Sequence, residues 1–219
     1  MKQNPDLAVL YSEFVLSLYP ILIKTVNTNI FTLPDTINYF DMSYNSVYAF
    51  YKGSSHDYSL PTDLKIFNAS FNKLDFISDN IPKQLIALNV SNNTVKYIPK
   101  LPETLKILNA SSNTIKWFDQ ELPNLEKLNL SYNHIYYFRF DRLKENLRFL
   151  DLSGNQLKEI TGNVFPANIE VIRLMDNRLE DIPELPPNLK ELDVSHNKIK
   201  TITNYPASLL ELDVSHNVL

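Results

Sequence analysis

Apolar and polar residues alternate over short stretches that recur along most of the chain. Around Leu88, Asn89 and Val90 the alternation has a period of two, which is typical of a β-strand with one buried face. The same alternation returns at residues 67–69, 108–110, 128–130, 150–152, 172–174, 192–194 and 212–214. We expect successive strands to stack in parallel into one long sheet, with neighbours about 4.8 Å apart.

An asparagine follows each strand at a fixed position, and these asparagines measure the period of the pattern. They are Asn45, Asn72, Asn93, Asn113, Asn133, Asn155, Asn177, Asn197 and Asn217. The steps between them are 27, 21, 20, 20, 22, 22, 20 and 20 residues. A period in this range predicts a right-handed solenoid, mostly β, whose repeats bury their apolar faces against each other. We predict that the asparagine amides pair backbone groups that the sheet leaves unpaired, which is a structural role.

The segments that connect one strand to the next are short and contain proline. After Val95 about ten residues bring the chain back to Leu105, and Pro99 and Pro102 lie among them. Proline lacks an N–H donor and fixes φ near −65°, so we expect extended rather than helical connections. The two 22-residue units differ, because residues 140–147 and 160–165 leave room for one helical or 3₁₀ turn.

The pattern divides the chain into a terminal cap and a repeat domain. Residues 1–33 are expected to hold a capping helix over residues 4–18, or a helix that docks an adaptor, followed by a degenerate first repeat. Residues 34–219 form the repeat domain, with about nine repeats and no cap after the last. Residues 51–58 are a turn-forming stretch inside the 27-residue step, and we predict that they form a protruding loop. We expect the open sheet edge near Leu219 to pair with something or to be continued in a longer natural protein.

Composition narrows the classes of partner. The net charge of −4 argues against non-specific nucleic-acid binding, because such proteins present a basic face. No apolar run approaches the ~18 residues of a membrane-spanning helix. The absence of cysteine favours a reducing compartment, so we expect a cytoplasmic location, in the protein's own cell or after delivery into a host cell.

The repeat units resemble those of the leucine-rich repeat family. Units such as IPELPPNLKELDVSHNKI and IPKLPETLKILNASSNTI are similar to repeats of effectors secreted by Gram-negative pathogens, whereas LRFLDLSGNQLKEITGNVF is closer to generic eukaryotic repeats. The resemblance covers more than four fifths of the chain and implies a curved solenoid with its parallel sheet on the concave side. Some effectors of this type append a ubiquitin-ligase domain with a catalytic cysteine. This sequence contains neither, so the resemblance does not imply that activity.

Outward positions of the strands form the candidate binding surface. The column before the second motif leucine is apolar in six repeats between Tyr39 and Val171, and such a stripe on a solvent-facing sheet predicts a protein partner. The alternative is simply the preference of β-branched residues for strands. The last two repeats are acidic instead, which favours a basic partner segment. The predicted partner-binding residues are Tyr39, Ile66, Asn68, Asn89, Ile107, Asn109, Asn129, Phe149, Val171, Arg173, Glu191 and Asp193.

The sequence predicts neither a catalytic site nor a cofactor. Three glycines are too few and too scattered for a phosphate-binding loop. Ser195 and Ser215 precede His196 and His216 at the same position of adjacent repeats, so we interpret these pairs as products of the repeat rather than parts of a triad. The two histidines could hold a metal, but their position is a surface turn that also accepts Tyr and Gly, and we predict no metal site.

We therefore predict a non-enzymatic scaffold that binds a protein partner on its concave surface, and a host-directed effector is one kind of protein that fits this prediction. We expect a monomer unless the open edge pairs with a second chain. Two alternatives remain at this point: the recognition part of a longer protein, and the regulatory subunit of a larger enzyme or signalling complex, such as a phosphatase.

Overall fold

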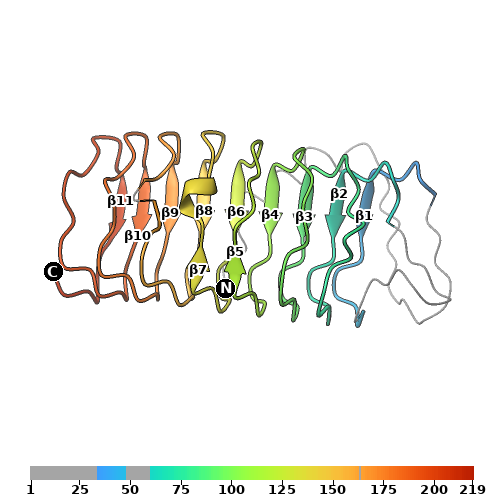
Figure 1. Ribbon diagram of the computed structural model, residues 1–219, viewed down its shortest axis with the longest axis horizontal. Coiled ribbons are helices and arrows are strands. Elements are labelled where there is room, and N and C mark those ends of the chain that lie inside the picture. Colours follow the sequence, from blue (N-terminus) through green and yellow to red (C-terminus); the bar gives the residue numbers. More distant parts are fainter. Residues whose placement is uncertain (1–33, 48–59, 163) are drawn as a thin grey trace.

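The protein is an elongated solenoid, seen in a computed structural model that describes residues 34–47, 60–162 and 164–219 (Figure 1). The predicted cap over residues 1–33 and the predicted loop at residues 51–58 lie outside the described residues. Each repeat contributes one three-residue strand to the same sheet. A return segment then leads from the end of that strand to the start of the next.

Nine parallel strands form the main sheet, in the order of the chain. They are β1 (Tyr39–Asp41), β2 (Ile66–Asn68), β3 (Ala87–Asn89), β4 (Ile107–Asn109), β6 (Lys127–Asn129), β8 (Phe149–Asp151), β9 (Val171–Arg173), β10 (Glu191–Asp193) and β11 (Glu211–Asp213). Equivalent residues of neighbouring repeats are in register, as in the pairing of Leu88 with Phe67 and Leu108. The predicted parallel solenoid is confirmed, and columns read from the sequence are columns on the sheet.

A second sheet forms where the return segments begin. β5 (Trp117–Phe118) and β7 (Tyr137–Phe138) pair in parallel, with Trp117 opposite Tyr137. The apolar pattern of the sequence does not predict this sheet. A single 3₁₀ turn, η1 (Phe140–Arg142), follows β7 and confirms the turn expected in the first 22-residue unit. In the second unit Thr161 and Gly162 lie in a turn, but residue 163 lies outside the described residues, so the helical or 3₁₀ turn expected over 160–165 stays a prediction.

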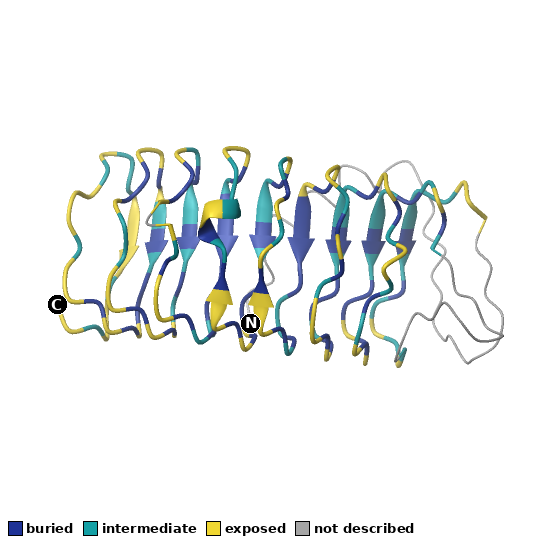
Figure 2. Ribbon diagram, viewed as in Figure 1, coloured by how far each residue is buried: buried dark blue, intermediate teal, exposed yellow. Residues whose placement is uncertain are grey.

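The core lies between the sheet and the return segments and runs the length of the molecule. In most strands the middle residue is buried and its two neighbours are not, as in β3 and β9. Aromatic residues continue the core where the repeats are longest: Phe138 stacks on Phe118, and Phe140 meets Phe138 edge-on, with ring centroids 5.8 and 4.6 Å apart. The burial pattern in Figure 2 shows this interior, and shows β11 as an exposed strand.

The motif asparagines bond successive repeats together. Asn113 Nδ2 donates to the Ala110 carbonyl of its own repeat and to the Val90 carbonyl of the preceding repeat, at 3.1 and 3.0 Å. Its Oδ1 accepts the Val95 N–H of the preceding repeat at 2.9 Å. Equivalent bonds recur from Asn93 to Asn217. The predicted structural role of these residues is confirmed, because each amide satisfies backbone groups that the sheet leaves unpaired.

Candidate functional site

The outward face of the nine-stranded sheet, which we call the sheet face, carries the residues predicted to bind a partner. Its first column runs from Tyr39 in β1 to Glu211 in β11, and in-register pairing places neighbours side by side. Ile107 and Phe149 are only 6% and 9% exposed, because these neighbours cover them. The predicted stripe is therefore not uniformly solvent-facing. Tyr39, Ile66 and Val171 are half-buried.

The second column of the sheet face shapes the turns. Asn89 Oδ1 accepts the backbone N–H of Ser91 at 3.1 Å and its hydroxyl at 2.8 Å. The same pair of bonds forms at Asn68, Asn109 and Asn129. The serines two residues further on, which the alternation along each strand predicts to point outward as well, are instead largely buried beneath these bonds. The asparagines thus have a structural role that sequence reasoning missed.

Three of the four asparagines in this second column have an amide group without a protein acceptor among the described residues. Within the described part of the chain, the Nδ2 groups of Asn89, Asn109 and Asn129 donate to no protein acceptor, whereas Asn68 Nδ2 donates to Asp41. Three neighbouring repeats thus contain a row of amide donors, of which Asn109 is only 9% exposed. A row of donors at the spacing of parallel strands suits carbonyl or carboxylate oxygens of an extended segment.

The C-terminal part of the sheet face is charged. Arg173 binds Glu191 through two hydrogen bonds of 2.6 and 3.2 Å, and its guanidinium lies 5.4 Å from the centroid of the Phe149 ring. The bond to Glu191 raises the pKa of Arg173. Burial raises the pKa of the Asp151 carboxyl, against the opposing bonds from Ser153 and the charge of Arg173. The structure therefore brings Phe149, Arg173 and Glu191 into one contact, as predicted site residues of three successive strands.

Acidic side chains outnumber basic ones in this region. Asp193 Oδ1 accepts the Ser195 N–H and hydroxyl, and Asp213 accepts the Ser215 N–H. These bonds with Ser215 are the largest cause of the lowered pKa of Asp213, and the charges of His196 and His216 add to it. Glu211 is exposed in β11. Carboxylates thus surround the one arginine of these strands, which leaves this end of the sheet face negative.

The turn that follows each strand contains one residue in the left-handed region of φ. These nine residues are Tyr44, Phe71, Asn92, Ser112, Tyr132, Gly154, Asp176, His196 and His216, with φ between 53° and 64°. They form a column along one edge of the sheet, where the rings of Tyr44 and Phe71 stack at 4.4 Å and those of His196 and His216 at 4.1 Å. Asn, Asp and Gly at this position were the signal in the sequence for positive φ.

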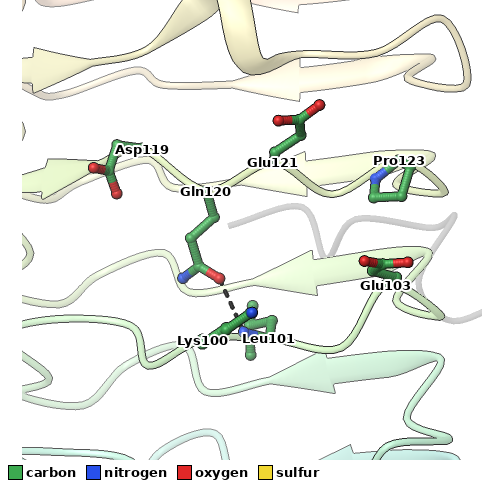
Figure 3. Close-up of a pocket in the computed structure, with 7 residues that line it drawn as sticks. All are labelled: Lys100, Leu101, Glu103, Asp119, Gln120, Glu121 and Pro123. Carbon is green, nitrogen blue, oxygen red and sulfur yellow. Dashed lines mark hydrogen bonds between the residues drawn. The ribbon is translucent and has the colours of Figure 1, made fainter.

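A shallow hollow of about 400 Å³ lies between two return segments, at Lys100–Leu101 and Asp119–Gln120 (Figure 3). Gln120 accepts the Leu101 N–H at 2.9 Å and donates to the Pro99 carbonyl at 2.8 Å, so it joins the two segments. Glu121 is held by Arg142 and Lys144, and its bond with Lys144 is the largest cause of its lowered pKa. These contacts are structural, and the hollow shows no nucleophile paired with a base.

The described ranges contain neither a candidate metal site nor a candidate membrane span. No group of three or more His, Cys, Asp or Glu residues there could hold a metal ion. In the same ranges, no helix is long and apolar enough to cross a membrane.

The fold and its outward face define a repeat solenoid that presents a long, ordered binding surface. Two sequence models described as leucine-rich repeat match the chain, one at residues 121–135 and 186–201 and the other at residues 146–167. The chain is a leucine-rich repeat protein, as the sequence resemblance implied. No curated protein matches it in sequence.

Several solved structures share the fold. YopM from Yersinia enterocolitica is 29% identical with a TM-score of 0.80, over 90% of this chain and 41% of its own. YopM from Yersinia pestis, described as a leucine-rich effector protein, is 25% identical with a TM-score of 0.68, over 85% of this chain and 57% of its own. InlJ from Listeria monocytogenes, at 20% identity and a TM-score of 0.66 over 77% of this chain and 37% of its own, shares the fold alone. The chain thus spans less than two thirds of these structures.

Proposed function

We propose that this protein is a non-enzymatic interaction scaffold whose sheet face binds an extended segment of a protein partner. The observation that carries the proposal is the row of free amide donors on Asn89, Asn109 and Asn129, next to a charged cluster around Arg173. Backbone carbonyls of an extended segment accept the amide bonds, and half-buried apolar residues such as Ile66 and Val171 contact its side chains.

The acidic residues of the last strands favour one orientation of the bound partner segment. The carboxylates of Glu191, Asp193 and Glu211 favour a partner whose basic residues meet β10 and β11. Such rim charges mainly raise the association rate and select against wrong partners. We place the partner in the cytoplasm, of the protein's own cell or of a host cell, because the chain lacks cysteine and is similar to YopM.

Capture by matched variants tests this proposal. The full chain and an Ile66→Glu/Val171→Glu variant are used as bait in host-cell lysate, with a Lys83→Gln/Lys198→Gln variant that changes the net charge equally as the control. We expect the first variant to lose the proteins that the wild type captures and the control to keep them. Ile107 is unsuitable for this test, because it is buried and a charge there would damage packing. Retention of the same partners by the Ile66→Glu/Val171→Glu variant would place their binding elsewhere.

A second function has a specific observation in its favour. The chain spans 41% of the Yersinia enterocolitica structure, so it is also suited to be the recognition part of a longer protein or the regulatory subunit of an enzyme complex. Size-exclusion chromatography of the native protein from its own cells distinguishes this alternative. A species of the mass of the 219-residue chain would count against it, and a larger covalent chain or stable complex would support it.

A further inference from the structure

A strip of exposed aromatic side chains lies on the return segments, away from the sheet face. It comprises Tyr97, Trp117, Tyr136 and Tyr137 from three successive repeats, and we call it the aromatic strip. Trp117 is 47% exposed and Tyr136 is 60% exposed. Large aromatic side chains are usually buried in a soluble monomer, and Trp and Tyr are enriched where proteins contact partners.

The second sheet holds this strip in place. In β5 and β7 the second residue of each strand, Phe118 or Phe138, is buried, and the first, Trp117 or Tyr137, therefore points outward. In Figure 2 each of these two strands is exposed over one part and buried over the other. Trp117 and Tyr137 are partners in the ladder, so their side chains are direct neighbours. Tyr137 also hydrogen-bonds Arg139.

Two lysines without salt bridges flank the strip. Lys96 and Lys116 precede Tyr97 and Trp117, are exposed, and contact no carboxylate among the described residues. They occupy one position of adjacent repeats. In two later repeats the same position holds Glu180 and Lys200, which form a salt bridge of 3.0 Å.

The salt bridge between Glu180 and Lys200 shows that side chains at this position of adjacent repeats are close enough to form an ion pair. A carboxylate of one repeat reaches the ammonium of the next, and the same arrangement recurs between Lys106 and Glu126 and between Lys190 and Glu170. At Lys96 and Lys116 two like charges stand at this spacing instead. An external carboxylate placed between them would make the contacts that Glu180 makes with Lys200.

We propose that the aromatic strip is a second interaction surface, which docks an extended acidic segment of a protein partner. Carboxylates of that segment lie between Lys96 and Lys116, and its apolar rings pack on Tyr97, Trp117 and Tyr136. A row of aromatic side chains favours an extended segment. Proline-containing segments are already extended before they bind, so their proline rings pack on aromatic surfaces with little loss of entropy. A single-stranded nucleic acid fits less well, because it carries a phosphate at every nucleotide and must also pass Asp75 or Glu159, whereas a peptide can place neutral residues beside those carboxylates.

The chain contains one tryptophan, and it lies in the strip, so its fluorescence reports occupancy there. The probe is a synthetic twelve-residue peptide of alternating glutamate and proline, added to the full chain while iodide quenches Trp117. We expect saturable protection of Trp117 from quenching. Peptides with lysine or glutamine in place of glutamate are the comparisons, and both should protect less.

Charge-reversal variants locate the contact. Lys96→Glu/Lys116→Glu should weaken binding of the glutamate peptide roughly tenfold, since each exposed ion pair contributes modestly. A Lys96→Gln/Lys116→Gln variant should show a smaller loss, and Lys83→Glu/Lys198→Glu, with the same change in net charge as the reversal, should bind like the wild type. Circular dichroism confirms that each variant retains its fold.

Three results would overturn the proposal. Equal protection by the glutamate and glutamine peptides would show that the two lysines do not select acidic side chains. Binding that leaves iodide quenching of Trp117 unchanged would place the peptide on another face. Protection by single-stranded oligothymidylate at concentrations where the glutamate peptide gives none would make the strip a nucleic-acid surface.

Discussion

At the scale of single residues, two kinds of position fix the geometry of each repeat. The motif asparagine joins adjacent repeats through bonds such as those of Asn113 with Val90 and Val95. The left-handed residue turns the chain at the end of each strand, and eight of the nine such residues carry a side chain. A left-handed conformation costs an L-residue about 1–2 kcal/mol, so the bonds around it must outweigh that cost.

Truncation of a motif asparagine should be costly. Asn113→Ala removes the acceptor of the Val95 N–H and the donor to Val90, and leaves buried backbone groups unpaired. We expect a loss of roughly 1–3 kcal/mol in the free energy of unfolding, measured by urea denaturation. Asn124→Ala is the matched control, because its exposed Nδ2 donates only to the Glu103 carbonyl. Equal losses for both variants would contradict the structural role of the ladder.

Both space and φ favour glycine at the turn position of the sixth repeat. A Cβ added at Gly154 would lie 2.7 Å from Cδ1 of Tyr132, and φ there is +64°. We expect Gly154→Ala to lower the free energy of unfolding by about 1–2 kcal/mol. Tyr132→Ala in the same chain should recover part of the loss, and a double-mutant cycle measures that part. Strictly additive effects would show that the Tyr132 ring is not the obstacle.

Burial of Asp151 predicts a stability that depends on pH. Burial raises its pKa above the ordinary value of 3.8, so the folded state holds this proton more tightly than the unfolded state. The carboxylate therefore lowers stability at neutral pH, and this penalty disappears as pH falls below the unfolded value. Asp151→Asn should stabilise the protein at pH 7, and the gain should vanish in acid. Asparagine fits the position, since Asn129 occupies it in the preceding repeat. Thermal melts at both pH values check this, and a gain that persists in acid would refute the electrostatic cause.

At the scale of elements, the strands were predictable because alternation and burial coincide. Each predicted strand lies where apolar residues such as Leu88 alternate with polar ones, and each forms the predicted parallel pair. The prolines correctly predicted return segments without long helices. Two features were missed. The pairing of β5 with β7 involves two residues per strand, which is too short for a periodic signal, and the burial of Ile107 depends on neighbours in other repeats.

Core truncation should depend on the place of the repeat in the array. Leu128→Ala removes a fully buried side chain from β6 and should cost roughly 2–5 kcal/mol through the cavity it leaves. Leu212 occupies the same position in β11 but is 44% exposed. Leu212→Ala should therefore cost much less. Chemical denaturation of both variants decides this, and equal costs would mean that the exposed strand is covered in solution.

For the candidate site, the sequence could predict which side of the sheet its residues occupy but not their side-chain contacts. The sequence placed Asn89, Arg173 and Glu191 on the outward side of the strands correctly, because alternation fixes the side of the sheet. It could not show that Oδ1 of Asn89 is used by Ser91 or that Arg173 binds Glu191, since these contacts depend on side-chain conformation across repeats. That the predicted residues bind a partner remains a prediction.

At the scale of the whole molecule, the described strands pair each with the next along the array, so stability is distributed along one axis. Interior repeats have two neighbours, and the ninth repeat presents an exposed strand. Hydrogen exchange should show strong protection for amides of β4, β6 and β8 and weak protection for those of β11, because local opening begins where fewest groups are buried. Uniform protection along the array would indicate a single cooperative unit instead.

The asparagine ladder has a consequence for how such a chain changes over generations. Each of its bonds between repeats joins one fixed position of a repeat to one fixed position of a neighbouring repeat, as Asn133 Oδ1 does by accepting the Ile115 N–H. Duplication or deletion of one whole unit in the gene therefore regenerates the same bonds at the new junction. The length of this protein is a heritable trait that can vary in whole units, and the span of the surface it offers varies with it.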